Sequence, residues 1–268
     1  MFQLRNPLSR RQFLLVACLL GGTNVSVLAE TTTVQVAAAA DLVYCLDELT
    51  TAFHQQQPSI DLKLTTGSSG NFFTQIEQGA PFDVFLSADV GYPEKLVAEG
   101  LASADSLFVY ANGKIALWTT KPDTVPVAQG LNVLTDSQRV QKIAIANPDH
   151  APYGRAAKAA LEKAGLWPSV ESRLVLGENI AQTAQFVQTG NADCGIVALS
   201  LLLGPKLKGV GTYQIIDPKL YPPLEQAAVL TQNGKANSAA RTYFDFLRSP
   251  AARQIFDRYG FTIPTSGS

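Results

Sequence analysis

Strand-like and helix-like patterns alternate along the chain after residue 30, and this alternation limits the possible folds more than any other feature. Residues 60–66, IDLKLTT, and residues 82–88, FDVFLSA, have the short apolar pattern of strands. Residues 92–100, YPEKLVAEG, are typical of a helix, with proline near the first turn and glycine after the end. The alternation continues to two helices at the C-terminus. It predicts an α/β fold with parallel-rich mixed sheets flanked by helices.

Two proline-containing stretches are candidate crossing points between two lobes. They are residues 119–129 and 217–225. We therefore expect lobe 1 to contain residues 30–119 and 223–268, and lobe 2 to contain residues 120–222. A single large sheet is the alternative. In a two-lobe α/β protein the ligand site is expected in the cleft between the lobes, where strand ends and helix starts meet.

Residues 1–29 have the pattern of a secretory signal peptide. Arg10 and Arg11 belong to a basic stretch, and the apolar run that follows is too short to span a bilayer. Residues 27–29, Val-Leu-Ala, resemble a signal-peptide cleavage site. We expect the mature chain to begin at Glu30 and to lie in the periplasm.

The export route and the final attachment have alternatives. Residues 9–14, SRRQFL, resemble a twin-arginine signal, and an ordinary export signal that contains two arginines is the other option. A lipoprotein cleavage box ending at Cys18 would instead leave the protein lipid-anchored. Each alternative takes the protein out of the cytoplasm.

The charge of the mature chain excludes a nucleic-acid-binding role. Removal of residues 1–29 takes three arginines from the 21 basic residues and leaves 18 against 22 acidic residues, a net charge of −4. Phosphate backbones are bound by clustered Lys and Arg. We expect no nucleic-acid partner.

The cysteines and histidines of the mature chain give no pattern for a metal site. Cys45 falls on an amphipathic helix pattern and Cys194 opens an apolar strand, so we expect two separately buried thiols, with a disulfide as the alternative. His54 and His150 are the only histidines, which are too few for a His-rich metal site. We expect no protein–metal ligands and no cofactor.

Four segments share one form, in which a strand ends, small residues follow and a helix begins. The start of a helix leaves backbone N–H groups without partners and carries the positive end of the helix dipole. Each segment alone is typical of a structural cap, but four together could surround an oxyanion with donors and need no Lys or Arg. The segments are residues 37–42, 65–73, 147–157 and 176–182.

The mature chain resembles the periplasmic molybdate-binding proteins of ABC importers, which have the type II periplasmic-binding-protein fold. The motifs that carry the resemblance are AAAADL, GSSGNFFTQIEQGAPFDVFLSAD, IANPDHAPYGRAAKAAL, CGIVALS and FDRYGFTI. The resemblance implies a monomeric two-lobe binding protein rather than an enzyme. It would hold molybdate, and often tungstate, through N–H groups and hydroxyls, and would deliver the anion to a membrane permease.

Several site residues follow from this resemblance, position by position. Ser69 matches the family's serine in the second loop, with Ser68 beside it. Tyr153 and Ile180 fall where backbone N–H groups meet the anion.

The chain departs from the family pattern at two places, the first loop and the last ligand. Ala40 and Asp41 replace a serine of the first loop, and Ala198 replaces a tyrosine whose hydroxyl reaches the anion. Because a carboxylate would repel an oxyanion, we expect Asp41 to cap its helix with its side chain turned away and to contribute its N–H, as Ala40 would. Tyr153 is a candidate to supply the missing hydroxyl from the opposite wall.

Other functions remain as alternatives from the residues themselves. One is a binding protein for sulfate, phosphate, an organic anion or an iron–anion complex. A different class is a serine hydrolase with Ser68 or Ser69 as nucleophile and His150 as general base, although GSSG lacks the G-x-S-x-G spacing. A purely structural exported domain is the third.

Overall fold

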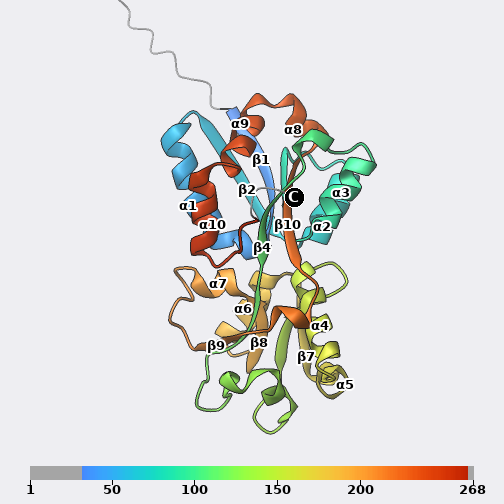
Figure 1. Cartoon of the computed structure of the whole chain (residues 1–268), viewed down its shortest axis with the longest axis vertical. Coiled ribbons are helices and arrows are strands. Elements are labelled where there is room, and N and C mark those ends of the chain that lie inside the picture. Colours follow the sequence, from blue (N-terminus) through green and yellow to red (C-terminus); the bar gives the residue numbers. More distant parts are fainter. Residues whose placement is uncertain (1–31, 265–268) are drawn as a thin grey trace, which may run out of the picture. The chain divides into compact units, whose positions relative to one another are not determined.

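The computed structural model describes residues 32–264, which form two separate five-stranded sheets (Figure 1). The first sheet has the order β2-β1-β3-β10-β4 and the second has the order β7-β6-β8-β5-β9. Two sheets exclude the single-sheet alternative. The strands are β1 Thr32–Ala39, β2 Ile60–Gly67, β3 Val84–Ser87, β4 Phe108–Gly113, β5 Ile115–Thr119, β6 Ile143–Ala146, β7 Leu174–Gly177, β8 Cys194–Ala198, β9 Thr212–Ile215 and β10 Leu224–Leu230.

Both sheets follow the same plan. In the first, β1 pairs in parallel with β2 and β3, and β10 pairs antiparallel with β3 and β4. In the second, β6 pairs in parallel with β7 and β8, and β5 pairs antiparallel with β8 and β9. The predicted parallel-rich mixed sheets are confirmed.

Helices cover both sheets, as the alternating sequence pattern predicts (Figure 1). The α-helices are α1 Val43–Gln56, α2 Ser69–Glu77, α3 Gly91–Ala98, α4 Pro152–Lys163, α5 Trp167–Val170, α6 Ile180–Gln188, α7 Leu199–Leu203, α8 Gln232–Ala236, α9 Ser238–Leu247 and α10 Pro250–Arg258. The 3-10 helices are η1 Ala40–Leu42, η2 Ala104–Ser106, η3 Val127–Thr135, η4 Glu171–Arg173 and η5 Pro218–Leu220. We call each sheet with its covering helices a lobe.

The first sheet has a hydrophobic core on each face. Alternate residues of β3 point to opposite faces, so Val84 and Leu86 join the core under α1, α9 and α10, whereas Phe85 joins the core under α2 and α3. Burial on both faces explains why residues 84–86 of this strand are all apolar rather than alternating. The arrangement leaves the ends of the strands, rather than their faces, free to build a site.

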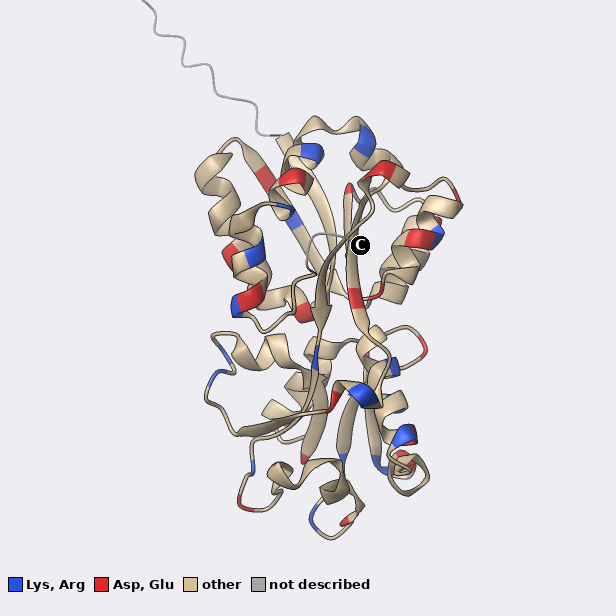
Figure 2. Ribbon diagram, viewed as in Figure 1, with Lys and Arg blue, Asp and Glu red and all other residues tan. Residues whose placement is uncertain are grey.

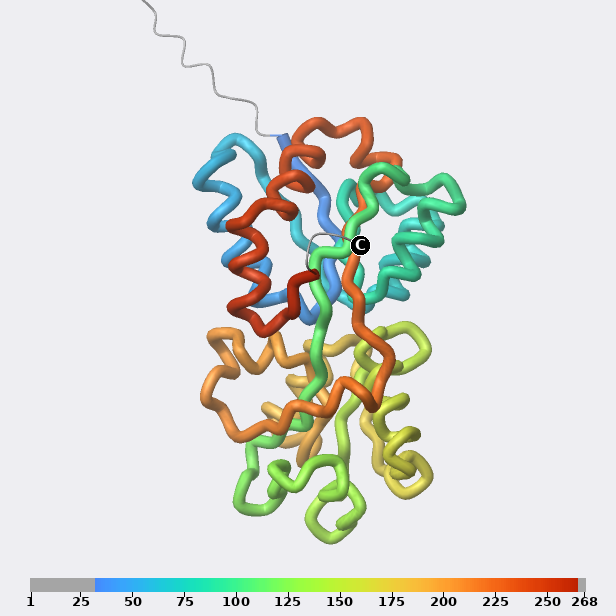
Figure 3. The backbone as a smooth tube through the Cα atoms, viewed as in Figure 1, coloured from blue at the N-terminus to red at the C-terminus, as the bar shows by residue number. Residues whose placement is uncertain are grey.

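The chain crosses between the lobes twice (Figure 3). The first crossing is at Lys114, because β4 belongs to the first sheet and β5 to the second. The predicted boundary at residue 119 is therefore too late, since residues 115–119 pair with β8 and β9 of lobe 2. The return lies between the end of β9 and the start of β10.

Cys45 and Cys194 are both buried and free, which confirms two separate thiols. They belong to the cores of different lobes. Burial raises the pKa of the Cys194 thiol to about 12, so it stays protonated at neutral pH.

Within residues 32–264, no helix is long and apolar enough to cross a membrane. The predicted signal peptide, its cleavage site at residues 27–29 and Cys18 lie outside the described residues.

Candidate functional site

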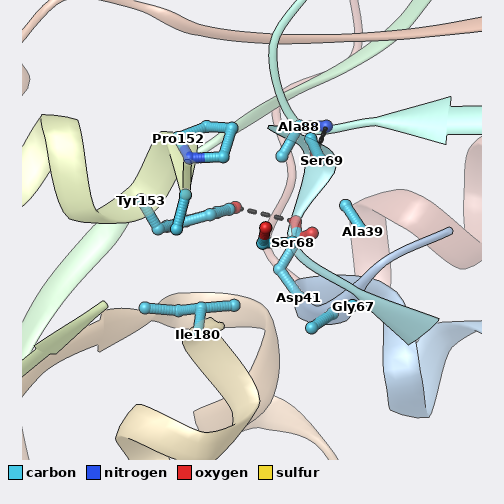
Figure 4. Close-up of a pocket in the computed structure, with 11 residues that line it drawn as sticks. Ala39, Asp41, Gly67, Ser68, Ser69, Ala88, Pro152, Tyr153 and Ile180 are labelled. Carbon is cyan, nitrogen blue, oxygen red and sulfur yellow. Dashed lines mark hydrogen bonds between the residues drawn. The ribbon is translucent and has the colours of Figure 1, made fainter. Parts of the chain in front are cut away.

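One pocket brings together all six residues that the sequence predicts for the oxyanion site (Figure 4). The cavity that these residues enclose has a volume of about 10 Å³, close to the roughly 10–15 Å³ that a single water molecule requires. Its size favours a small ligand. The predicted residues in the lining are Ala40, Asp41, Ser68, Ser69, Tyr153 and Ile180, and the others are Ala39, Gly67, Ala88, Ala151 and Pro152.

The pocket forms where the ends of strands meet the starts of helices from both lobes. β1 leads into η1 and β2 leads into α2 in lobe 1, and the parallel pairing of these strands places both ends at the same edge of the sheet. Lobe 2 contributes the starts of α4 and α6. A carboxyl-terminal sheet edge of this kind is where open α/β folds bind ligands.

The Ser69 hydroxyl is completely buried and held in a defined orientation. Its Oγ accepts a hydrogen bond from the backbone N–H of Ala88 at 2.9 Å (Figure 4). A serine hydroxyl has one proton to donate, and this contact does not use it. Ser69 can therefore donate to a ligand in the pocket.

Ser68 is the N-cap of α2 and connects the two lobes. Its Oγ accepts from the N–H of Asn71 at 3.3 Å and lies 2.9 Å from Nδ1 of His150. The N–H of Gly70 donates to the carbonyl of His150 at 3.0 Å. The loop that carries His150 is thus docked directly on the start of α2.

The backbone N–H groups of Tyr153, in the first turn of α4, and of Ile180, the first residue of α6, have no protein acceptor in the described part of the chain. The Asn179 side chain caps α6 by accepting from Ala181 and Gln182, and so leaves the Ile180 N–H open. Both groups are donors suited to an anion.

The predicted orientation of the Asp41 side chain is wrong, whereas the contribution of the Asp41 and Ala40 N–H groups stays a prediction. The Asp41 side chain does not cap η1, because Oδ2 accepts from the Tyr153 hydroxyl at 2.8 Å and from Nε2 of Gln226 at 2.6 Å (Figure 4). Burial raises the pKa of this carboxyl to about 6, while the bonds to Gln226 and Tyr153 lower it.

The Tyr153 hydroxyl is likewise engaged elsewhere. Its one proton goes to Asp41, so in this structure the hydroxyl does not replace the tyrosine that is missing at position 198. Ala198 itself is buried at the end of β8 and does not line the pocket.

Sequence reasoning missed Gln226, which organises the back of the pocket. Its Oε1 accepts from the Tyr110 hydroxyl at 2.8 Å, which orients Nε2 toward Asp41 and Tyr153. Gln226 is completely buried within the apolar strand β10. The signal in the sequence is a glutamine within the otherwise apolar run QAAVL. A buried amide needs hydrogen-bond partners, so this glutamine indicates a buried polar network.

The pocket lining contains no Lys, Arg or His among the described residues. Lys and Arg are spread over helices and loops of both lobes, interspersed with Asp and Glu (Figure 2). The described residues also hold no group of three or more His, Cys, Asp or Glu side chains suited to a metal ion. Recognition in this pocket must therefore come from N–H groups and hydroxyls.

Polar contacts between the lobes surround the pocket. Nδ2 of Asn71 donates to Glu178 at 2.7 Å, and Glu178 lies 3.6 Å from Nε2 of His150. Arg155 pairs with Asp89 and donates to the Tyr92 hydroxyl. These contacts hold the two lobes together around the site.

The comparisons with known proteins agree with this geometry. The family model for bacterial extracellular solute-binding proteins matches residues 34–262. The molybdate-binding protein ModA of Rhodobacter capsulatus is 44% identical over 73% of this chain and 75% of its own length. ModA of Azotobacter vinelandii is 40% identical over 91% and 95%. The solved structure of an Azotobacter vinelandii periplasmic molybdate-binding protein superposes with a TM-score of 0.81 at 33% identity, over 87% of this chain and 100% of that chain, which confirms the predicted two-lobe fold.

Proposed function

Because the chain belongs to the bacterial extracellular solute-binding protein family, we propose that it captures molybdate in the pocket between its lobes and delivers it to the permease of an ABC importer. The relatives from Rhodobacter capsulatus and Azotobacter vinelandii are both named molybdate-binding proteins.

One observation in the structure carries the proposal. The pocket offers the free proton of Ser69 and the open N–H groups of Tyr153 and Ile180, and its lining has no cationic side chain among the described residues. Donors from both lobes, at helix starts, suit a small tetrahedral dianion. Closure around the anion excludes water and strengthens each contact.

Isothermal titration of residues 30–268 with molybdate, tungstate and sulfate tests the proposal. We expect saturable binding of molybdate with one site. Tungstate has the same charge and shape and is expected to bind comparably, and sulfate, which is smaller, more weakly. No heat and no thermal stabilisation with any of the three anions would contradict the proposal.

The second part of the proposal concerns the cellular location, the N-terminal processing and the oligomeric state of the protein. The mature protein is a periplasmic monomer that begins at Glu30 and carries no cofactor besides the transported anion. Intact-mass measurement of the exported protein, with light scattering, checks this. A mass that matches an acylated N-terminus at Cys18 would favour the lipid-anchored alternative.

The contact between Ser68 and His150 also bears on the hydrolase alternative. Oγ of Ser68 lies 2.9 Å from Nδ1 of His150, and Nε2 of His150 lies 3.6 Å from the Glu178 carboxylate. However, the family consists of binding proteins rather than enzymes, and Ser68 already serves as the N-cap of α2. We assign the three residues to closure of the pocket.

A further inference from the structure

The Asp41 carboxylate is an unusual group to find in a pocket for anions. It is 1% exposed, lies in the lining, and points toward Tyr153 on the opposite lobe (Figure 4). Its backbone carbonyl accepts from the Ser200 hydroxyl at 2.7 Å, so the residue is fixed from both lobes. The side chain cannot rotate away without breaking these contacts.

The two carboxylate oxygens are not equivalent. Oδ2 accepts from both Tyr153 and Gln226, and Gln226 gives its other amide proton to the Tyr153 oxygen at 2.9 Å. Every proton of these two partners is therefore used. Oδ1 is buried and has no partner among the described residues. A buried acceptor of this kind requires a partner that the protein alone does not supply.

No fixed positive charge compensates Asp41 within the described part of the chain. The titratable groups that face it are Tyr153 from α4, Tyr110 from β4 and Cys45 from α1, and burial raises the pKa of each above its usual value. All three are neutral near pH 7. An ionised Asp41 would therefore repel a dianion in the same pocket without screening.

We infer that the pocket binds its oxyanion together with one proton, which sits on Oδ1 of Asp41 and is donated in a hydrogen bond to an anion oxygen. The proton comes from solvent, and no other bond forms or breaks. Asp41 thereby changes from a repelling acceptor into a donor, and takes over the function of the serine hydroxyl that this position lacks. The inference rests on the proposed function.

The direction of the pH dependence follows from this assignment. Burial, partly offset by the hydrogen bonds from Gln226 and Tyr153, raises the pKa of Asp41 to about 6 before any ligand is present. Above that pH the protein must take up a proton to bind, so affinity is expected to fall roughly tenfold for each further pH unit. Below it Asp41 is already protonated and the affinity levels off.

Titration of molybdate into residues 30–268 in buffers of different ionisation enthalpy measures the linked protons directly. At about pH 7.5 we expect uptake of close to one proton per anion bound. Binding without proton uptake would overturn this inference and leave the proposed function intact, whereas absence of binding would contradict both.

Asp41→Asn is the decisive variant, because its amide keeps an acceptor for Tyr153 and Gln226 and presents a fixed N–H donor at the Oδ1 position. We expect it to bind molybdate without proton uptake, with an affinity independent of pH and tighter than that of the unmodified protein above about pH 7. Asp47→Asn, an exposed aspartate on α1, is the matched control and should keep the proton uptake.

His150 is the other group near the pocket that could take up the proton, through its contact with Ser68. In His150→Gln, we expect the uptake of one proton to remain. Loss of uptake in this variant, together with its persistence in Asp41→Asn, would move the proton to His150 and overturn the assignment. If Asp41→Asn does not fold, the His150→Gln variant decides the question, because uptake that persists in it assigns the proton to Asp41 and uptake that is lost assigns it to His150.

Discussion

The Ser69 hydroxyl is fixed for donation because its oxygen already accepts a hydrogen bond from the N–H of Ala88. Ser69→Ala removes this donor and leaves the Ala88 N–H without its partner. We expect molybdate binding to weaken by roughly 1–3 kcal/mol, as measured by isothermal titration. Ser59→Ala, which changes an exposed serine before β2, is the control and should bind normally. An unchanged affinity in Ser69→Ala would remove this hydroxyl from the site.

Asp41 also affects stability without ligand. Its pKa is raised in the folded protein from 3.8 to about 6, so the folded state binds the proton more tightly than the unfolded state. The stability that this provides is complete below about pH 4 and is lost as pH rises through about pH 6. We therefore expect Asp41→Asn to be more stable than the unmodified protein at pH 7, by about 3 kcal/mol at most.

Urea unfolding of both proteins between about pH 4 and pH 7.5 measures this difference. The gain from Asp41→Asn should be small at the acid end and grow as pH rises. A gain that is constant over this range would show that the carboxyl does not titrate as the structure indicates.

The residues of the pocket show what sequence can and cannot predict at this scale. Ser69, Tyr153 and Ile180 were placed correctly in the lining because strand ends and helix starts are local patterns, supported by the family resemblance. The prediction that the Asp41 side chain caps its helix is wrong because the partners of this side chain are 112 and 185 residues away in sequence. A cap is visible locally, whereas a network with Tyr153 and Gln226 exists only after folding.

At the scale of elements, β4 ends at Gly113, which lies directly beside the hydrogen-bonded side chains of Tyr153 and Gln226. A Cβ atom on Gly113 would lie 2.3 Å from the Tyr153 hydroxyl and 2.9 Å from Nε2 of Gln226. We expect Gly113→Ala to push these side chains apart and to destabilise the protein by about 1–3 kcal/mol in urea unfolding.

Tyr153→Phe provides the control for this effect. It removes the hydroxyl that the new methyl group would meet, so Gly113→Ala should cost less in the Tyr153→Phe background than alone. A double-mutant cycle measures this coupling. Strictly additive costs would show that the glycine is needed for another reason.

The strands and helices with strong periodicity were predictable, and the weak ones were not. β9 has only four residues and all are exposed, Tyr213 and Ile215 included, so it has no buried face of the kind that marks the other strands. The apolar run CGIVALS, residues 194–200, has the pattern of one strand, but it divides into β8 and the start of α7. The lobe boundary was placed too late because residues 115–119 look the same in either sheet, and only their pairing with β8 and β9 assigns them.

At the scale of the whole molecule, the fold class followed from the order of the elements, because alternating strands and helices can form few other architectures. The duplicated sheet plan did not follow, since it depends on which strands pair antiparallel at each edge. The same limit applies to the contacts between lobes, such as Asn71 with Glu178, which join segments 107 residues apart. Local pattern predicts the parts of a binding protein, and pairing over long sequence distances determines how they close on a ligand.

The distribution of charge over the molecule leads to a prediction about salt. Residues 30–268 carry a net charge of −4, and no Lys or Arg of the described residues lines the pocket, so long-range attraction does not bring in the dianion. Buried contacts to N–H groups and hydroxyls are screened little by ions, whereas repulsion by the net charge is screened. We therefore expect molybdate affinity to change less than about threefold between roughly 0.05 M and 0.5 M NaCl, and in the direction of tighter binding. Isothermal titration at fixed pH checks this, and a steep loss of affinity with salt would show that exposed cationic side chains, rather than the helix starts, hold the anion.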